Sequence, residues 1–111
     1  MIEEIEPADL VRRCLSGELW QLIDVREAWE LEIARVEATA TMPITHIPMT
    51  EIPARYSELQ PAQPVAVLCH SGGRSARVAG FLVQQGFSRV ANVRGGIDAW
   101  SSDHDPSIPR Y

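Results

Sequence analysis

One short segment of the chain combines a cysteine, two glycines and an arginine in an order that can support nucleophilic chemistry. Its residues are Cys69, His70, Ser71, Gly72, Gly73, Arg74 and Ser75. The segment follows an apolar run and precedes a stretch of helical character. Two glycines let the backbone curl so that successive N–H groups point inward and bind an anion at a helix N-terminus. Because these dipoles and the charge of Arg74 stabilise a thiolate, we predict that Cys69 is a nucleophile.

The other residues of this segment have predicted roles around the thiol. We expect residues 70–74 to bind the substrate, with Arg74 placed to hold an oxyanion. His70 could exchange a proton beside Cys69, or it could point away from it. A buried, inert thiol at a strand end is the alternative for Cys69. The glycines, the arginine and the helix that follow it have little packing rationale, so we favour the functional interpretation.

Four further residues are predicted to support the site: Asp24, Arg26, Ser75 and Arg94. Asp24 could pair with an arginine and brace the loop, or it could cap a turn. Arg94 follows a predicted strand and could make a second anion contact, or it could be a surface cation.

Metal binding and cofactors are not expected. The two cysteines, Cys14 and Cys69, are far apart in the sequence, and the three histidines are scattered. Structural metal sites need several such ligands at short intervals. Cys14 lies at helical spacing with Leu10, Val11 and Leu15, so we predict that it belongs to the core rather than acting as a second reactive thiol.

Composition and charge exclude several classes of protein. The 111 residues suffice for one domain with its own core. The net charge is −5, and all ten basic residues are arginines. An acidic chain without a basic run is a poor nucleic-acid binder. No apolar stretch approaches the roughly 20 residues of a membrane span, and the acidic N-terminus does not resemble a secretory signal. We therefore expect a soluble cytoplasmic protein that binds neither nucleic acid nor membrane.

The order of apolar runs predicts an α/β fold, a small parallel sheet with helices on both faces. The expected strands are Ile2–Ile5, Leu19–Val25, Val65–Cys69 and Val90–Val93, and the expected helices are 7–15, 75–85 and one near Glu51–Leu59. Continuous apolar runs are typical of strands covered on both faces. Residues 34–53, with three prolines, are predicted to form an irregular connection, and residues 103–111 an extended tail. In an open α/β sheet, ligands bind beyond the carboxyl ends of the strands, where the Cys69 loop must lie.

Three segments, taken in order, resemble the rhodanese-like sulfurtransferases. They are Asp24–Glu27, residues 69–75 and Val93–Trp100. The resemblance covers nearly the whole chain and implies one rhodanese-like domain over residues 1–111. It also implies that Cys69 takes sulfane sulfur from a donor such as thiosulfate, carries it as a persulfide, and passes it to a thiol or protein acceptor. Arg74 and the amides of residues 70–74 would stabilise that persulfide.

The C-terminal segment resembles a more specific group within this family. The connection 34–43, in contrast, departs from the family pattern. Residues 96–111 look like the end of the rhodanese domain of ubiquitin-activating-like proteins that serve molybdopterin synthesis and tRNA thiolation. Residues 34–43 lack the glycine and histidine usual in the family, and a match at His46 would require inserted residues.

Two other interpretations stay open at this point. A cysteine phosphatase or arsenate reductase uses a similar loop, but with five residues between cysteine and arginine, whereas four separate Cys69 from Arg74. The other interpretation is a non-catalytic sulfur-sensing or interaction module. The presence of both Cys69 and Arg74 in this chain counts against it.

Overall fold

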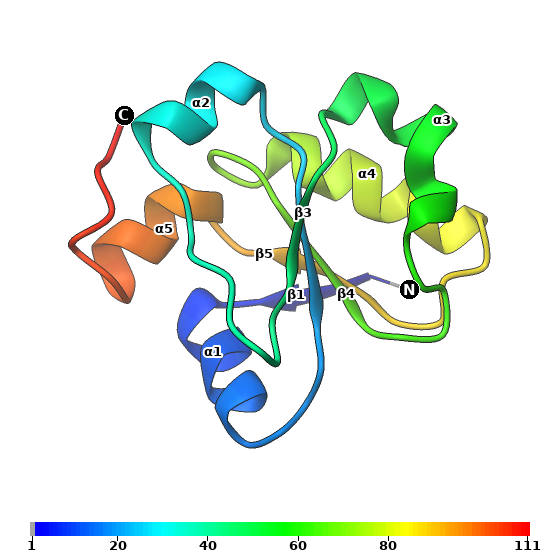
Figure 1. Ribbon diagram of the computed structural model, residues 1–111, viewed down its shortest axis with the longest axis horizontal. Helices are drawn as coiled ribbons and strands as arrows, with labels where there is room; N and C mark the ends of the chain where they lie inside the picture. The colour runs from blue at the N-terminus through cyan, green and yellow to red at the C-terminus, as the bar shows by residue number, and fades with distance from the viewer. Residues whose placement is uncertain (1) are drawn as a thin grey trace.

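Five parallel strands form the sheet of this chain in a computed structural model that describes residues 2–111 (Figure 1). The strands are β1 (Ile2–Ile5), β2 (Gln21–Asp24), β3 (Ile44–His46), β4 (Val65–Leu68) and β5 (Val90–Val93). Their order across the sheet is β1-β5-β4-β2-β3, and every pairing is parallel. The expected α/β architecture is therefore confirmed.

Helices cover both faces of the sheet. They are α1 (Pro7–Leu15), α2 (Ala28–Ile33), α3 (Ile52–Arg55), α4 (Gly73–Gln84) and α5 (Gly96–Asp103), with 3₁₀ turns at Met49–Glu51 and Tyr56–Glu58. In Figure 1, α1 and α5 lie on one side of the sheet, α3 and α4 lie on the other, and α2 lies above one edge of it. None of the helices within residues 2–111 is long and apolar enough to cross a membrane.

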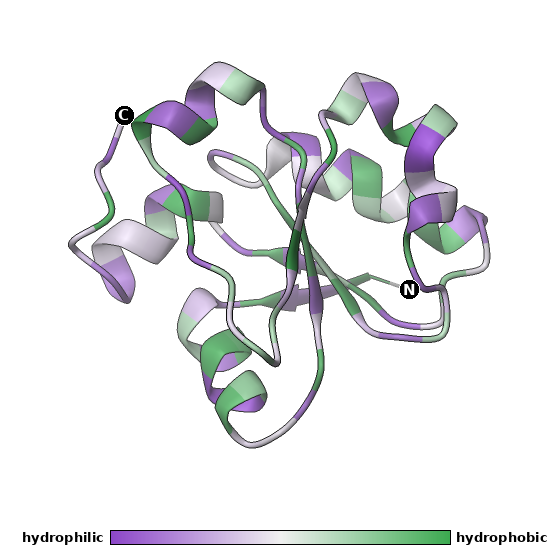
Figure 2. Cartoon of the chain, in the orientation of Figure 1, coloured by the Kyte–Doolittle hydropathy of each residue, from purple (hydrophilic) through white to green (hydrophobic). Residues whose placement is uncertain are grey.

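The alternation of side chains along each strand divides the core into two halves. In β4, Ala66 and Leu68 pack with α1 and α5, whereas Val65 and Val67 pack with α3 and α4. All four residues are fully buried, as the continuous apolar run predicted. Figure 2 shows hydrophobic stretches in the central part of the sheet and alternating hydrophobic and hydrophilic residues along the helices.

Two local predictions are wrong and one helix was not predicted, each for a physical reason. The connection 34–53 contains an edge strand, β3, which pairs with β2 on one side only and so lacks a long apolar run. The short helix α2 was not predicted, because its six residues give too few turns for a periodic pattern. Leu15, expected on the apolar face of α1, is 83% exposed because it occupies the last position of that helix.

A glycine inside α4 offers a test of the fold. Gly80 lies in the helix interior, and a Cβ added there would meet only Ile2 Cδ1 at 4.0 Å, an ordinary contact. We expect Gly80→Ala to raise the free energy of unfolding by about 0.5–1 kcal/mol, because alanine loses less backbone entropy in a helix. Urea unfolding measures the change.

The matched control is Gly86→Ala just beyond the same helix. Gly86 has φ +91° with open space around it, so alanine there is strained without any clash. Its unfolding free energy should fall by about 1 kcal/mol. If the unfolding free energies of Gly80→Ala and Gly86→Ala changed in the same direction, the backbone conformations assigned to these two glycines would be contradicted.

Candidate active site

Cys69 lies directly after β4, at the edge of the sheet where the carboxyl ends of the strands meet. Its side chain is 1% exposed and packs with the α3 and α4 half of the core. The Sγ atom accepts a hydrogen bond from the Gly72 N–H at 3.0 Å and lies 3.2 Å from Ser75 Oγ. The thiol therefore lies buried beneath the loop formed by residues 69–73.

The backbone of this loop has free N–H donors next to Cys69 in the sequence. Gly72 has φ +112° and forms the N-cap of α4, a conformation that favours glycine. Within residues 2–111, the amides of His70, Ser71, Gly73 and Arg74 donate to no acceptor. Together with the N-terminus of α4, a helix of twelve residues, they provide partial positive charge beside Cys69. Such a nest can hold an anion or an anionic sulfur.

A second helix N-terminus holds the carbonyl side of the loop. At the start of α5, Ile97 N–H donates to the Cys69 carbonyl at 2.9 Å and Asp98 N–H donates to the His70 carbonyl at 3.0 Å. Gly96 has φ +61°, and a Cβ there would lie 2.4 Å from the His70 oxygen. Only glycine lets the turn after β5 approach this closely. The loop carbonyls are thereby turned away from the sulfur.

Arg74 is held by a buried carboxylate that sequence reasoning did not find. Its guanidinium binds Glu30 through two hydrogen bonds, at 2.7 and 2.8 Å, and the Glu30 side chain is 4% exposed. Hydrogen bonds from Arg74 lower the pKa of Glu30 to about 2, against the opposing effect of burial. The same bonds raise the pKa of Arg74. The positive charge that Arg74 was expected to bring to the thiol is therefore compensated by Glu30.

Two supporting residues, Asp24 and Arg26, form a second buried ion pair. The Arg26 side chain is fully buried, and its guanidinium reaches both oxygens of Asp24, the shortest contact being 2.8 Å. The Asp24 carboxylate also accepts the Arg26 N–H, so it pairs and caps a turn at once. His46 Nε2 lies 2.6 Å from the Arg26 carbonyl and packs the end of β3 against this turn.

A series of hydrogen-bonded polar side chains, Ser75, Asn92 and Glu4, lies next to Cys69. The Ser75 hydroxyl is buried and lies within hydrogen-bond distance of Cys69, Gly72 O and Asn92 Oδ1. The Asn92 amide in turn donates to the Glu4 carboxylate. Because a carboxylate only accepts, Glu4 orients the Asn92 amide with its oxygen toward Ser75.

The remaining predicted residues lie farther from the sulfur. The His70 ring stacks on Tyr111 with centroids 4.0 Å apart, so it points out of the nest. Ser71 is exposed. Arg94 is exposed, its guanidinium makes no hydrogen bond or ion pair with any residue the structure describes, and its N–H donates to the Ile5 carbonyl.

Sequence reasoning missed three residues of the site: Glu30, Asn92 and Tyr111. A signal existed for two of them. Glu30 follows Glu27 by three positions, the spacing of a capping box, and the structure forms that box. Asn92 is a polar residue inside the apolar strand β5, which indicates a buried hydrogen-bond partner. Tyr111 lies in the C-terminal segment 96–111 that carried part of the resemblance, but no role was predicted for it.

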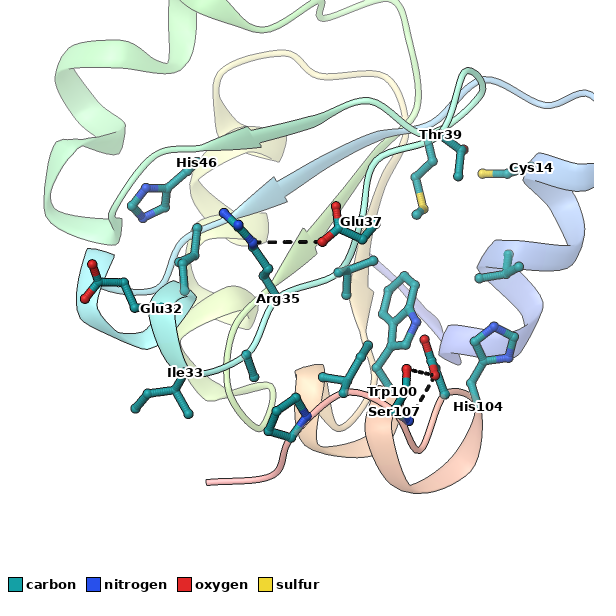
Figure 3. Close-up of a pocket in the computed structure, with 18 of the residues that line it drawn as sticks. Cys14, Glu32, Ile33, Arg35, Glu37, Thr39, His46, Trp100, His104 and Ser107 are labelled. Carbon is teal, nitrogen blue, oxygen red and sulfur yellow. Dashed lines mark hydrogen bonds and ion pairs between the residues drawn. The ribbon is translucent and has the colours of Figure 1, made fainter.

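A groove lies apart from Cys69. It has a volume of about 990 Å³ and lies between α1, α2, the connection 34–42 and α5, and no residue of the segment 69–75 lines it (Figure 3). Cys14 borders this groove, is 4% exposed, and has its pKa raised by burial, in keeping with the predicted core position. Within residues 2–111 no three His, Cys, Asp or Glu side chains cluster as metal ligands would. The groove and the Cys69 loop are therefore separate features of the molecule.

Comparisons with known proteins agree on one family. The family model for the rhodanese-like domain matches residues 7–103. A protein of *Allochromatium vinosum* named sulfurtransferase is 37% identical over 108 residues, which cover 97% of this chain and 96% of that protein. A crystal structure of a rhodanese-related protein from *Thermoplasma volcanium* superposes with a TM-score of 0.78 at 29% identity, covering 98% of this chain and 99% of that one.

Other relatives are longer than this chain. A chloroplastic rhodanese-like/PpiC domain-containing protein of *Arabidopsis thaliana* is 47% identical over 82% of this chain, which spans only 30% of that protein. For the adenylyltransferase and sulfurtransferase MOCS3-2 of *Zea mays*, at 33% identity, the match covers 86% of this chain and 20% of that protein. The same domain thus occurs both alone and as part of larger proteins.

The Glu30 carboxylate makes stability depend on acid pH. Its pKa is about 2 in the folded chain against an ordinary 4.5, so its stabilising effect is complete well above pH 4.5 and is lost as the pH falls toward 2. We expect Glu30→Gln to lower the unfolding free energy at pH 6 by about 3 kcal/mol, a deficit that shrinks by about 2 kcal/mol at pH 3. Urea unfolding at the two pH values measures it.

Glu32→Gln is the control for this test. Glu32 lies on the same helix but is exposed, so its variant should follow the wild type at both pH values. A Glu30→Gln deficit that does not change with pH would contradict the ion pair.

Proposed function

Because the chain belongs to the rhodanese-like sulfurtransferase family, we propose that it moves sulfane sulfur from a donor such as thiosulfate to a thiol acceptor through a persulfide on Cys69. The observation that carries this proposal is the hydrogen bond from the Gly72 N–H to Cys69 Sγ, in a loop whose other amides are free and which leads into the N-terminus of α4. A persulfide adds one anionic sulfur beyond Sγ, and those amides are the donors that would stabilise it.

The proposed reaction balances without an outside oxidant or reductant. The Cys69 thiol first loses its proton to solvent. The thiolate attacks the outer sulfur of thiosulfate, a new S–S bond forms, and the original S–S bond breaks with its electron pair leaving on sulfite. An acceptor thiolate then attacks the terminal sulfur of the persulfide, and Cys69 leaves as a thiolate. Each step displaces one sulfur nucleophile by another.

In this proposal the loop residues bind the anionic sulfur, and the surrounding residues hold the loop in position. The amides of His70, Ser71, Gly73 and Arg74 hold the anionic sulfur, together with the Gly72 N–H already on Sγ. Arg74 uses one N–H of each terminal nitrogen for Glu30 and keeps others for an oxyanion. The Asp24–Arg26 pair, with Arg26 also donating to the Glu30 carbonyl, supports α2.

The exposure of the loop supports a proposal about the acceptor, and the free cysteines support one about the compartment. The loop is open enough that Ser71 and Gly73 are exposed, so an acceptor thiol, small or carried by a protein, approaches from that side. We propose no nucleic-acid or membrane partner. Both cysteines are free thiols, which fits a reducing compartment such as the cytoplasm.

Sulfur transfer on Cys69 can be tested by intact mass. We expect incubation with thiosulfate to add one sulfur atom to the reduced protein and none to Cys69→Ser, because only Cys69 has the amide ring. Cys14→Ser should accept the sulfur as the wild type does, since Cys14 is buried in the core beside the groove and away from the loop. Label on Cys14 in peptide mapping would contradict the assignment.

The size of the loop separates this proposal from a phosphatase. Four residues lie between Cys69 and Arg74, and a phosphoryl group with three equatorial oxygens needs a wider ring of donors. We expect the protein to hydrolyse aryl phosphates no faster than Cys69→Ser does, as measured by release of phenolate. Cys69-dependent hydrolysis that outpaces sulfur transfer would favour the phosphatase interpretation.

A further inference from the structure

Tyr111 joins elements that are far apart in the sequence around the Cys69 loop. Its hydroxyl lies 2.9 Å from Arg26 NH1 and 2.8 Å from Glu30 Oε1. Its ring stacks on His70 with an interplanar angle of 5°. Figure 1 shows the C-terminal segment running beside α2, where these contacts form. One side chain therefore contacts both buried ion pairs and the residue next to Cys69.

The chemistry of its partners fixes the direction of the hydroxyl. A guanidinium only donates and a carboxylate only accepts, so Tyr111 accepts from Arg26 and donates to Glu30. Glu30 receives two further hydrogen bonds from Arg74. Burial raises the pKa of Tyr111, so the hydroxyl keeps its proton for Glu30 at neutral pH. The hydroxyl thus holds the carboxylate in the orientation that binds Arg74.

The ring restrains the loop from the outer side. His70 follows Cys69 directly, and its carbonyl is already bound from the inner side by the Asp98 N–H. The Tyr111 ring covers the His70 imidazole, while Trp29 packs edge-on against the outer part of Tyr111 with centroids 6.4 Å apart. His70 is therefore held between α5 and the C-terminal segment.

The C-terminal segment does not need Tyr111 to stay on the domain. Ile108 is buried in the α1 and α5 half of the core, and its carbonyl accepts the Ser101 hydroxyl. Arg110 forms an ion pair with Asp98. Because these contacts anchor the segment independently, replacing Tyr111 changes the site more than the fold.

We propose that Tyr111 is a positioning residue for sulfur transfer, acting through Glu30 on Arg74 and through His70 on the loop amides. This inference rests on the proposed function of Cys69 and extends it to a residue outside the loop. Its hydroxyl and its ring act on different partners, so two variants separate them. Tyr111→Phe removes the hydroxyl and keeps the stack, and Tyr111→Ala removes both.

The first measurement is amide hydrogen exchange in the sulfur-free protein, followed by NMR. We expect Tyr111→Ala to speed exchange of the loop amides 70–74 about tenfold, with Tyr111→Phe between it and the wild type. Exchange in β4 should not change. Unchanged loop exchange in Tyr111→Ala, or an equal rise across the whole domain, would overturn the proposal.

The second measurement compares two reactions of Cys69. We expect Tyr111→Phe to slow sulfur loading from thiosulfate about tenfold, the effect of one lost hydrogen bond to a charged group. Alkylation by neutral iodoacetamide should slow much less, because that reagent needs no anion-binding donors. A loop that loosens while thiosulfate loading stays at the wild-type rate, or equal slowing of both reactions, also overturns the proposal.

Tyr56→Phe is the matched control. Tyr56 packs edge-on against Phe81 in the α3 and α4 half of the core, and its hydroxyl forms no hydrogen bond with another described residue. This variant should match the wild type in both measurements. A wild-type protein that gains no sulfur from thiosulfate would remove the proposed function, whereas the exchange measurement would still decide whether Tyr111 positions the loop.

Discussion

The buried carboxylate of Glu30 is the interaction on which the geometry of the site depends. It accepts four hydrogen bonds, two on each oxygen: two from Arg74, one from Tyr111 and one from the Glu27 N–H. These donors come from the N-cap of α2, the first turn of α4 and the C-terminal segment. A buried charge is stable only when it is fully paired, and removing one partner of a buried pair costs about 3–5 kcal/mol. The three segments are therefore held together by a single group.

The Glu30 pair also decides where the positive potential of the site comes from. Arg74 is neutralised by Glu30 and Arg26 by Asp24, so the two buried pairs add no net charge beside Cys69. What remains is the field of the backbone: the N-terminus of α4 and the free amides of the loop. Dipoles of this kind act over a short range and stabilise charge on an atom that they surround. The positive potential beside Cys69 therefore comes from the backbone rather than from a net side-chain charge.

The loop is restrained from several directions, which keeps its free amides in place. The start of α5 binds the carbonyls of Cys69 and His70, and Gly96 allows the close approach. Below the sulfur, Glu4 orients Asn92, and Asn92 orients Ser75. Amides held ready before a substrate arrives need no reorganisation during the reaction, which is how such donors accelerate it. The contacts that restrain the loop are therefore the same contacts that keep its free amides in place.

Much of this protein could be predicted from its sequence, for a common reason. The apolar runs of β1, β2, β4 and β5, the helix after Gly73 and the place of Cys69 at the carboxyl edge all follow from local patterns of polarity and turn residues. Such patterns are written within a few consecutive positions. The edge strand β3 and the short helix α2 left weaker patterns and were missed, because each depends on packing against one neighbour.

Only the tertiary structure decided what surrounds the thiol. Glu30 lies 44 positions from Arg74, and Tyr111 lies 81 positions from Glu30, yet they share one hydrogen-bonded group. No periodicity links such residues. They meet because the parallel sheet brings the carboxyl ends of β2, β4 and β5 to one edge, and because a carboxylate buried there must find donors wherever the chain can supply them. The position of the Cys69 loop was thus determined locally by the sequence, whereas the groups that hold this loop were selected by burial in the folded chain.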